Sequence, residues 1–108
     1  MRQAEVLYKK EKAGILTQLD NASFVFTYED SWFHDINKPA ISLTLPKTQQ
    51  EYRSKYLFSF FYNMLPEGSN KQTVCFQNRI DAKDHFGILL TTAKQDTIGA
   101  VTIKKVHK

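Results

Sequence analysis

The stretch from Tyr52 to Gly68, YRSKYLFSFFYNMLPEG, constrains the fold most, because little of it is polar enough to face water. On a helical wheel of residues 52–65, Lys55, Ser59 and Asn63 share one narrow polar stripe, and apolar side chains cover the remaining arc of on the order of 240°. An ordinary amphipathic helix needs an apolar stripe of about 100°. We therefore expect a helix over 52–65 that either lies at the centre of the core or shows a second apolar face to a partner.

Pro66 ends this expected helix, because it lacks an N–H and its ring excludes the preceding residue from the helical region. Ser69 and Gln72 form a capping-box pattern, which predicts a second helix from there to about Arg79. Three apolar side chains of that helix are expected to face inward: Val74, Cys75 and Phe76.

A third helix is predicted after Asp81 and Asp84, either of which has the side chain of a helix N-cap. Its apolar positions follow helical spacing: Phe86, Leu89, Leu90 and Ala93.

Strand patterns occupy the rest of the chain. Residues 4–8 and 13–19 are predicted to pair around a KKEK turn, and residues 23–28 to form a third strand after a turn at Asp20 and Asn21. Residues 29–39 are predicted as a loop or one helical turn, capped by Asp30 or Ser31. Residues 40–46 alternate as a fourth strand, and 99–106 form the last. The prediction is a single α+β domain over 1–108, with about five antiparallel strands and about three helices.

Composition places the chain in a broad class. The net charge of +4 is scattered, which favours a solubility role for the lysines over a nucleic-acid-binding face, and no direct binding to nucleic acid is expected. One cysteine, no apolar leader and no apolar run of membrane-spanning length predict a soluble cytoplasmic protein without a membrane partner.

The residues needed for catalysis are not assembled in this sequence. No two of the four glycines lie within six residues of each other, which excludes both common glycine-rich phosphate loops. The three histidines and Cys75 have no metal-ligand spacing, and Cys75 is expected to be a small core residue. We expect no catalytic residue, no cofactor and no metal, and hence a protein that is not an enzyme.

Five motifs occur in a familiar order: TYEDSWFHD, ISLTLP, FFYNMLPEGSNKQ, DHFGILL and DTIGAV. Together they resemble the N-terminal subdomain of the HipA family of serine/threonine kinases, the toxins of HipBA toxin–antitoxin systems. The resemblance covers about 80 residues, from Tyr28 to Val101. A full HipA-like kinase continues with nucleotide-binding and catalytic loops, whereas this sequence stops at Lys108. In this it is similar to the HipS antitoxins of three-component HipBST systems, whose kinase HipT lacks the subdomain.

The resemblance implies an antitoxin that binds and inhibits a HipT-like kinase, while a DNA-binding HipB-like protein completes the system, in a ternary complex or separately. The alternative is a basic accessory or structural module that acts with HipB in autoregulation. Inhibition would either plug a kinase pocket or hold mobile loops in an inactive arrangement.

Two groups of residues are candidates for partner binding. The first is Trp32 with Phe33, since Trp is common in interface hot spots; its structural alternative is a ring that closes the end of the sheet. The second is the turn formed by Leu65, Pro66, Glu67 and Gly68, whose structural alternative is a corner between two helices.

Overall fold

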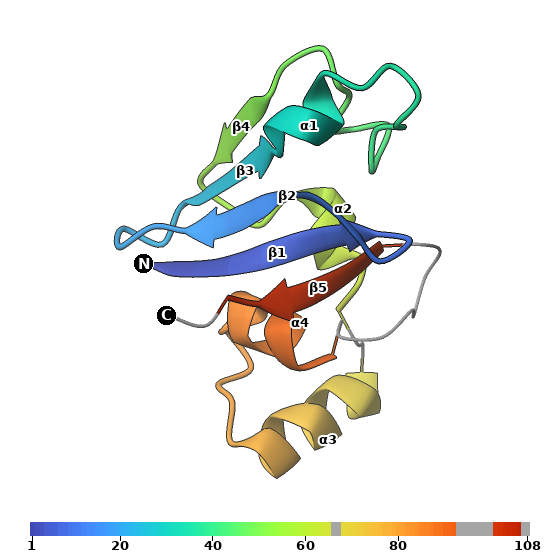
Figure 1. Ribbon diagram of the computed structural model, residues 1–108. Helices are drawn as coiled ribbons and strands as arrows, with labels where there is room; N and C mark the ends of the chain where they lie inside the picture. The colour runs from blue at the N-terminus through green and yellow to red at the C-terminus, as the bar shows by residue number, and fades with distance from the viewer. Residues whose placement is uncertain (66–67, 93–100, 107–108) are drawn as a thin grey trace.

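The computed structural model describes residues 1–65, 68–92 and 101–106. Five strands form one sheet in the order β4-β3-β2-β1-β5 (Figure 1). The strands are β1 (Arg2–Tyr8), β2 (Glu11–Gln18), β3 (Phe24–Tyr28), β4 (Glu51–Ser54) and β5 (Val101–Lys105). The helices are α1 (Asp30–Phe33), α2 (Ser59–Tyr62), α3 (Gly68–Asn78) and α4 (His85–Thr92). The predicted α+β class with a five-stranded antiparallel sheet is confirmed, with four helices rather than about three.

The predicted meander of the first three strands is confirmed. Lys9 and Lys10 connect β1 to β2 with φ angles of 49° and 71°, the left-handed conformation that a tight two-residue hairpin turn requires. The β2–β3 link closes where the Leu19 N–H donates to the Ser23 carbonyl at 2.8 Å. The last predicted strand, 99–106, is confirmed as β5 over Val101–Lys105, which pairs antiparallel with β1, while residues 99 and 100 lie outside the described residues.

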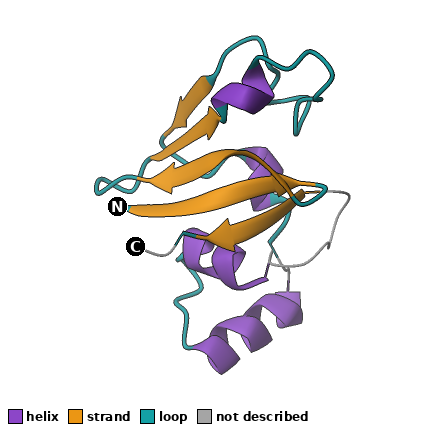
Figure 2. Ribbon diagram, in the orientation of Figure 1, coloured by secondary structure: helices purple, strands orange, loops and turns teal. Residues whose placement is uncertain are grey.

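The core lies on one face of the sheet, where α2 and α4 cover it (Figure 2). The Phe26 ring of β3 lies 5.8 Å from the Phe61 ring of α2, and Phe24 stacks on Phe86 of α4 at 6.2 Å. Aromatic pairs at such distances add to the stabilisation that burial alone provides. The sheet contributes further buried side chains to this face: Ala4, Val6, Leu16, Val101 and Ile103.

Gly14 of β2 allows the close packing of β3. A Cβ atom at this position would lie 2.5 Å from the Thr27 carbonyl oxygen and 2.9 Å from the Phe26 ring. The carbonyl belongs to the paired strand and cannot move aside without disturbing the ladder. We expect Gly14→Ala to lower the free energy of unfolding by about 1–3 kcal/mol through overcrowding, measured by urea unfolding. A variant as stable as the wild type would contradict this packing.

The prediction of a strand over 40–46 is wrong. This segment is part of a long loop, because the Tyr28 hydroxyl binds its backbone at two points: it accepts from the Ile41 N–H at 3.1 Å and donates to the Leu45 carbonyl. A turn between these points, with the Leu45 N–H 3.1 Å from the Ser42 carbonyl, directs Leu43 into solvent. The fourth strand is instead β4, at residues 51–54.

The prediction of a helix over 52–65 is also wrong. Tyr52 pairs with Phe26 across β3 and β4, so strand pairing overrides the helical periodicity at the start of this segment. Only α2 is helical, and the backbone then tightens, with the Leu65 N–H donating to the Tyr62 carbonyl at 3.1 Å. The apolar arc is divided: four side chains join the core and two large rings are exposed. The buried ones are Leu57, Phe61, Met64 and Leu65, and the exposed ones are Tyr56 and Tyr62.

Both later helices are confirmed, with corrections of detail. α3 begins at Gly68, one residue before the predicted cap at Ser69, and its Cys75 is buried as expected. Phe76, predicted to face inward, is 87% exposed, because Cys75 already occupies the side of α3 that meets the core. The predicted cap of α1 is wrong too: Glu29 is its N-cap, and no side chain caps it.

Asp84 caps α4, as one of the two predicted carboxylates. Its Oδ1 accepts the Gly87 N–H at 3.1 Å, and Arg2 Nη2 lies 2.6 Å away on the same oxygen. The hydrogen bond from Arg2 holds the pKa of Asp84 below its usual value of 3.8. A lowered pKa contributes stability that is present above about pH 4 and is lost as the pH falls through the folded-state pKa.

Two substitutions separate the cap from the charge of Asp84. We expect Asp84→Ala to lower the free energy of unfolding by about 1–2 kcal/mol at pH 7, because both the cap and the ion pair are lost. Asp84→Asn keeps a capping oxygen and should cost less. The difference in the free energy of unfolding between Asp84→Asn and the wild type should vanish at low pH, as measured by urea unfolding. If Asp84→Asn were as unstable as Asp84→Ala, the cap would contribute nothing.

No helix in the described ranges is both long and apolar enough to cross a membrane.

Candidate partner-binding surface

The loop between α1 and β4, residues 34–50, is the longest irregular segment between two described elements (Figure 1). We call it the α1–β4 loop. Loops of this length in a compact domain usually carry a function or lack order. The contacts on the inner side of the loop show that its backbone is ordered.

Trp32 of α1 packs against the inner side of the α1–β4 loop. Its side chain is only 4% exposed, and its Nε1–H donates to the Pro39 carbonyl at 2.8 Å. The ring lies 5.7 Å from Tyr8 of β1, and Lys38 Nζ sits 5.2 Å from its centroid. Trp32 therefore fixes the first half of the loop against the end of the sheet, as its structural alternative predicted.

Two tyrosine hydroxyls fix the second half of the loop. Tyr28, 1% exposed, joins the Ile41 and Leu45 backbones as described above, and burial raises the pKa of its phenol. Tyr52, from β4, donates its hydroxyl to the Pro46 carbonyl at 2.6 Å. All three hydrogen bonds connect the backbone of the loop to side chains of the strands, so the loop follows the sheet.

Two lysines complete the inner network. Lys47 Nζ donates to the carbonyls of Asp35 at 2.6 Å and Lys38 at 2.7 Å, and so connects the two halves of the loop. Lys38 Nζ also meets the Glu11 carboxylate at 2.6 Å, and this hydrogen bond raises the pKa of Lys38. The loop is thus held from within by side chains of the sheet, of α1 and of the loop itself.

The outer side of the same loop carries two aliphatic side chains in full contact with water. Ile36 is 96% exposed and Leu43 is 99% exposed. Single exposed apolar residues are common, but these two belong to one loop whose backbone is fixed by side-chain hydrogen bonds. A rigid support with exposed aliphatic side chains is suited to insertion into a partner's apolar pockets, because little ordering entropy is lost on binding.

The structure separates the two predicted groups of contact residues. Phe33 is half-buried beside Trp32, with its ring 6.5 Å from Tyr28. Leu65 is 9% exposed, Gly68 is the first residue of α3, and Pro66 and Glu67 lie outside the described residues. In Figure 1, α1 stands beside β3 and α3 lies beyond β5, so these two helices lie toward opposite edges of the sheet.

Sequence reasoning missed Ile36 and Leu43. Ile36 stands in the polar run HDINKP, where an isolated aliphatic residue signals exposure. Leu43 gave no such signal, because its alternation with Ile41 and Leu45 is typical of a buried strand face.

The other chemistry-bearing residues do not form a site in the part of the chain that is described. No group of three or more His, Cys, Asp or Glu side chains there could hold a metal ion. Cys75 is a free, buried thiol. His85 opens α4 and packs its ring against Tyr62 at 5.3 Å.

Comparisons with known proteins agree with this fold. An uncharacterized protein of Haemophilus influenzae strain Rd is 31% identical over 105 residues, which cover 97% of this chain and 93% of that protein. A solved structure titled N-terminal domain of HipA toxin superposes with a TM-score of 0.74 at 28% identity, covering 100% of this chain and 95% of that one. The family model for the HipA N-terminal domain matches residues 4–104. The chain therefore belongs to the HipA N-terminal domain family.

Proposed function

We propose that this chain is a HipS-like antitoxin, a cytoplasmic protein that binds a HipA-like serine/threonine kinase toxin of the HipT type and inhibits it. In this proposal residues 1–108 are one domain without enzymatic activity of its own. A HipB-like DNA-binding protein completes the three-component system, and inhibition is exerted by contact alone.

The observation that carries the proposal is the α1–β4 loop. In a chain of the HipA N-terminal domain family, a loop fixed from within exposes Ile36 and Leu43 almost completely. Hot spots of protein interfaces are side chains that enter desolvated pockets of the partner, surrounded by contacts that exclude water. We assign Ile36 and Leu43 to direct contact, with Phe33 at its margin and Trp32 as the support beneath.

The turn at Leu65, Pro66, Glu67 and Gly68 remains a second proposed contact. Gly68, at its end, is the first residue of α3, which lies beyond β5, whereas α1 stands beside β3. A kinase that engaged both regions would have to extend around the sheet. A kinase that engaged one would respond to substitutions in that region only, which single variants can distinguish.

Co-expression with a HipT-like kinase tests the proposal. We expect growth to be restored and a stable complex of both chains to be purified, with kinase activity suppressed in the complex. Growth without a complex would contradict inhibition by binding. A complex with full kinase activity would favour a purely structural role, and failure to restore growth would contradict the antitoxin function.

A further inference from the structure

Within the described residues, β5 is an edge strand of the sheet. Among the described residues it pairs only with β1. The Val106 N–H donates to the Gln3 carbonyl at 3.3 Å, which fixes the alternation along the strand: residues 102, 104 and 106 turn their backbone groups toward β1. The N–H and C=O groups of Ile103 and Lys105 therefore point away from the sheet, where they can accept a further strand.

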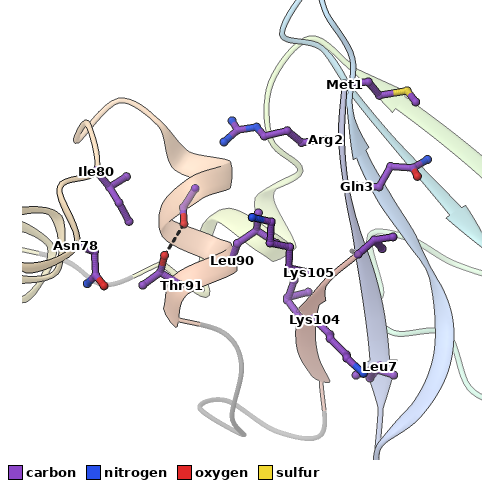
Figure 3. A pocket seen from close by; sticks show the side chains of 13 residues that line it. Met1, Arg2, Gln3, Leu7, Asn78, Ile80, Leu90, Thr91, Lys104 and Lys105 are labelled. Carbon is purple, nitrogen blue, oxygen red and sulfur yellow. Dashed lines mark hydrogen bonds between the residues drawn. The ribbon is translucent and has the colours of Figure 1, made fainter. Parts of the chain in front are cut away.

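A groove follows this edge. Its volume is about 860 Å³, and it lies between β5 and the helical layer (Figure 3). Ile103 contributes to its wall from the strand, Leu90 and Thr91 from α4, and Ile80 from the segment between the two long helices. Ile80 is half-buried and Leu90 is 9% exposed, so the groove offers an apolar wall beside an unpaired backbone edge.

Two ammonium groups flank the edge without a carboxylate partner in the described part of the chain. Lys104 and Lys105 are both exposed, and neither takes part in an ion pair there. Glu5 stands opposite Lys104 in the β1–β5 register, but its carboxylate lies 3.9 Å from Lys12. The other cations at the groove are already paired: Arg2 with Asp84, and the N-terminal ammonium group of Met1 with Asp20.

Because successive residues of a strand face opposite sides of the sheet, Lys104 and Lys105 present their charges on its two faces. Lys105 shares the core face with Ile103, and Figure 3 shows its side chain on the side of α4. An added strand would place one residue opposite each of these three positions. Its residues opposite the lysines would be adjacent in sequence, and the next residue would face the apolar wall.

We propose that β5 and this groove bind an extended acidic segment of another protein by strand addition. The segment has two adjacent carboxylates, opposite Lys104 and Lys105, and an aliphatic residue next to them, opposite Ile103 and over Leu90. Backbone pairing supplies affinity and the alternate side chains supply specificity, as in other cases of strand addition. A second copy of this chain does not fit, because pairing β5 with β5 would bring the lysines of both copies together. The surface is separate from the α1–β4 loop and does not depend on the proposed kinase.

The probe is a synthetic peptide with the sequence Thr-Val-Glu-Glu-Thr, together with its reverse order, since the direction of the added strand is open. Binding is followed by amide chemical shifts and hydrogen exchange of the folded protein. We expect the largest shifts, and slowed exchange, at the outward amides of Ile103 and Lys105. A matched peptide with lysines in place of both glutamates should not bind. Shifts spread over the surface, or absent from β5, would overturn the proposal.

Two charge-reversal variants test whether peptide binding depends on Lys104 and Lys105 or only on the net charge of the protein. Lys104→Glu with Lys105→Glu should weaken peptide binding at least about tenfold, because like charges then face each other. The control Lys10→Glu with Lys55→Glu makes the same change of net charge at exposed positions away from the groove, and should retain binding. Equal losses in both variants would reduce the effect to net charge and overturn the proposal.

Methylation of the peptide backbone tests the pairing itself. N-methyl groups on the alternate residues that pair with β5 should abolish binding, while methylation of the other alternate residues should leave it intact. If neither set of methyl groups affects binding, no strand is added. The two edge lysines would then serve only to keep the open edge from aggregating.

Discussion

The double variant Ile36→Ser with Leu43→Ser is expected to lose kinase binding while it remains fully folded. Both side chains are surrounded by water in the free protein, so their removal should change the free energy of unfolding by less than about 0.5 kcal/mol. On binding, complete burial of each is worth about 1.5–3 kcal/mol. Together they should account for roughly two to four orders of magnitude in Kd.

Isothermal titration against the purified kinase would measure this loss, with thermal unfolding as the check on folding. The matched control is Phe76→Ser on α3, an 87% exposed apolar side chain beyond the other edge of the sheet. It should bind as the wild type does. If Phe76→Ser lost affinity and the loop variant did not, the contact surface would lie on α3, and our assignment of the α1–β4 loop would be wrong.

The second large effect is expected for Tyr28→Phe. The change removes one oxygen atom from a side chain that is 1% exposed, and leaves both the Ile41 N–H and the Leu45 carbonyl without their partner. A buried polar group left unpaired costs about 1–3 kcal/mol, so the two together should lower the free energy of unfolding by about 2–6 kcal/mol. Urea unfolding at neutral pH measures this directly.

Tyr52→Phe is the natural control for Tyr28→Phe, because its hydroxyl supports the same loop through a single bond to Pro46 and the residue is half-buried. We expect a loss of about 1 kcal/mol there. The pH dependence offers an independent check. Because the pKa of Tyr28 is raised above 10.0, its contribution is complete below about pH 10 and is lost as the pH rises through the folded-state pKa. Tyr28→Phe should reduce the loss of unfolding free energy at alkaline pH. If the variant lost as much stability there as the wild type does, the hydroxyl would not be buried.

Local patterns were sufficient for most of the fold. The hairpin and the third strand follow from alternation and turn residues, and α4 follows from the Asp84 cap and the spacing of Phe86 and Leu89. The β1–β5 pairing required the structure, because periodicity identifies a strand but does not choose its neighbour.

The errors are concentrated between residues 40 and 65, where long-range contacts decide the local conformation. Residues 40–46 alternate like a strand, yet the hydroxyl of Tyr28 holds their backbone as a loop. Residues 51–54 fit a helical wheel, yet β3 offers them hydrogen bonds that a helix would have to replace. Neither the Tyr28 hydroxyl nor the hydrogen-bonding edge of β3 can be recognised from the sequence of these segments alone.

The candidate site was predicted in part. Trp32 and Phe33 lie at the same end of the sheet as the α1–β4 loop, but Trp32 supports the loop, and the side chains of the loop that meet solvent are Ile36 and Leu43. Residue type alone favours Trp as a contact. Only the burial of its ring and its hydrogen bond to the Pro39 carbonyl show that Trp32 lies on the inner side of the loop.

The pairing of β1 with β5 determines when the sheet can be completed during synthesis. Paired residues of β1 and β5 are more than 90 positions apart in the sequence, as Tyr8 and Val101 show. Because β5 closes a contact between segments that are translated far apart, the nascent protein has a hairpin and a third strand but an incomplete core until Ile103 emerges. For the proposed antitoxin, this delay sets the earliest moment at which a folded inhibitor can exist.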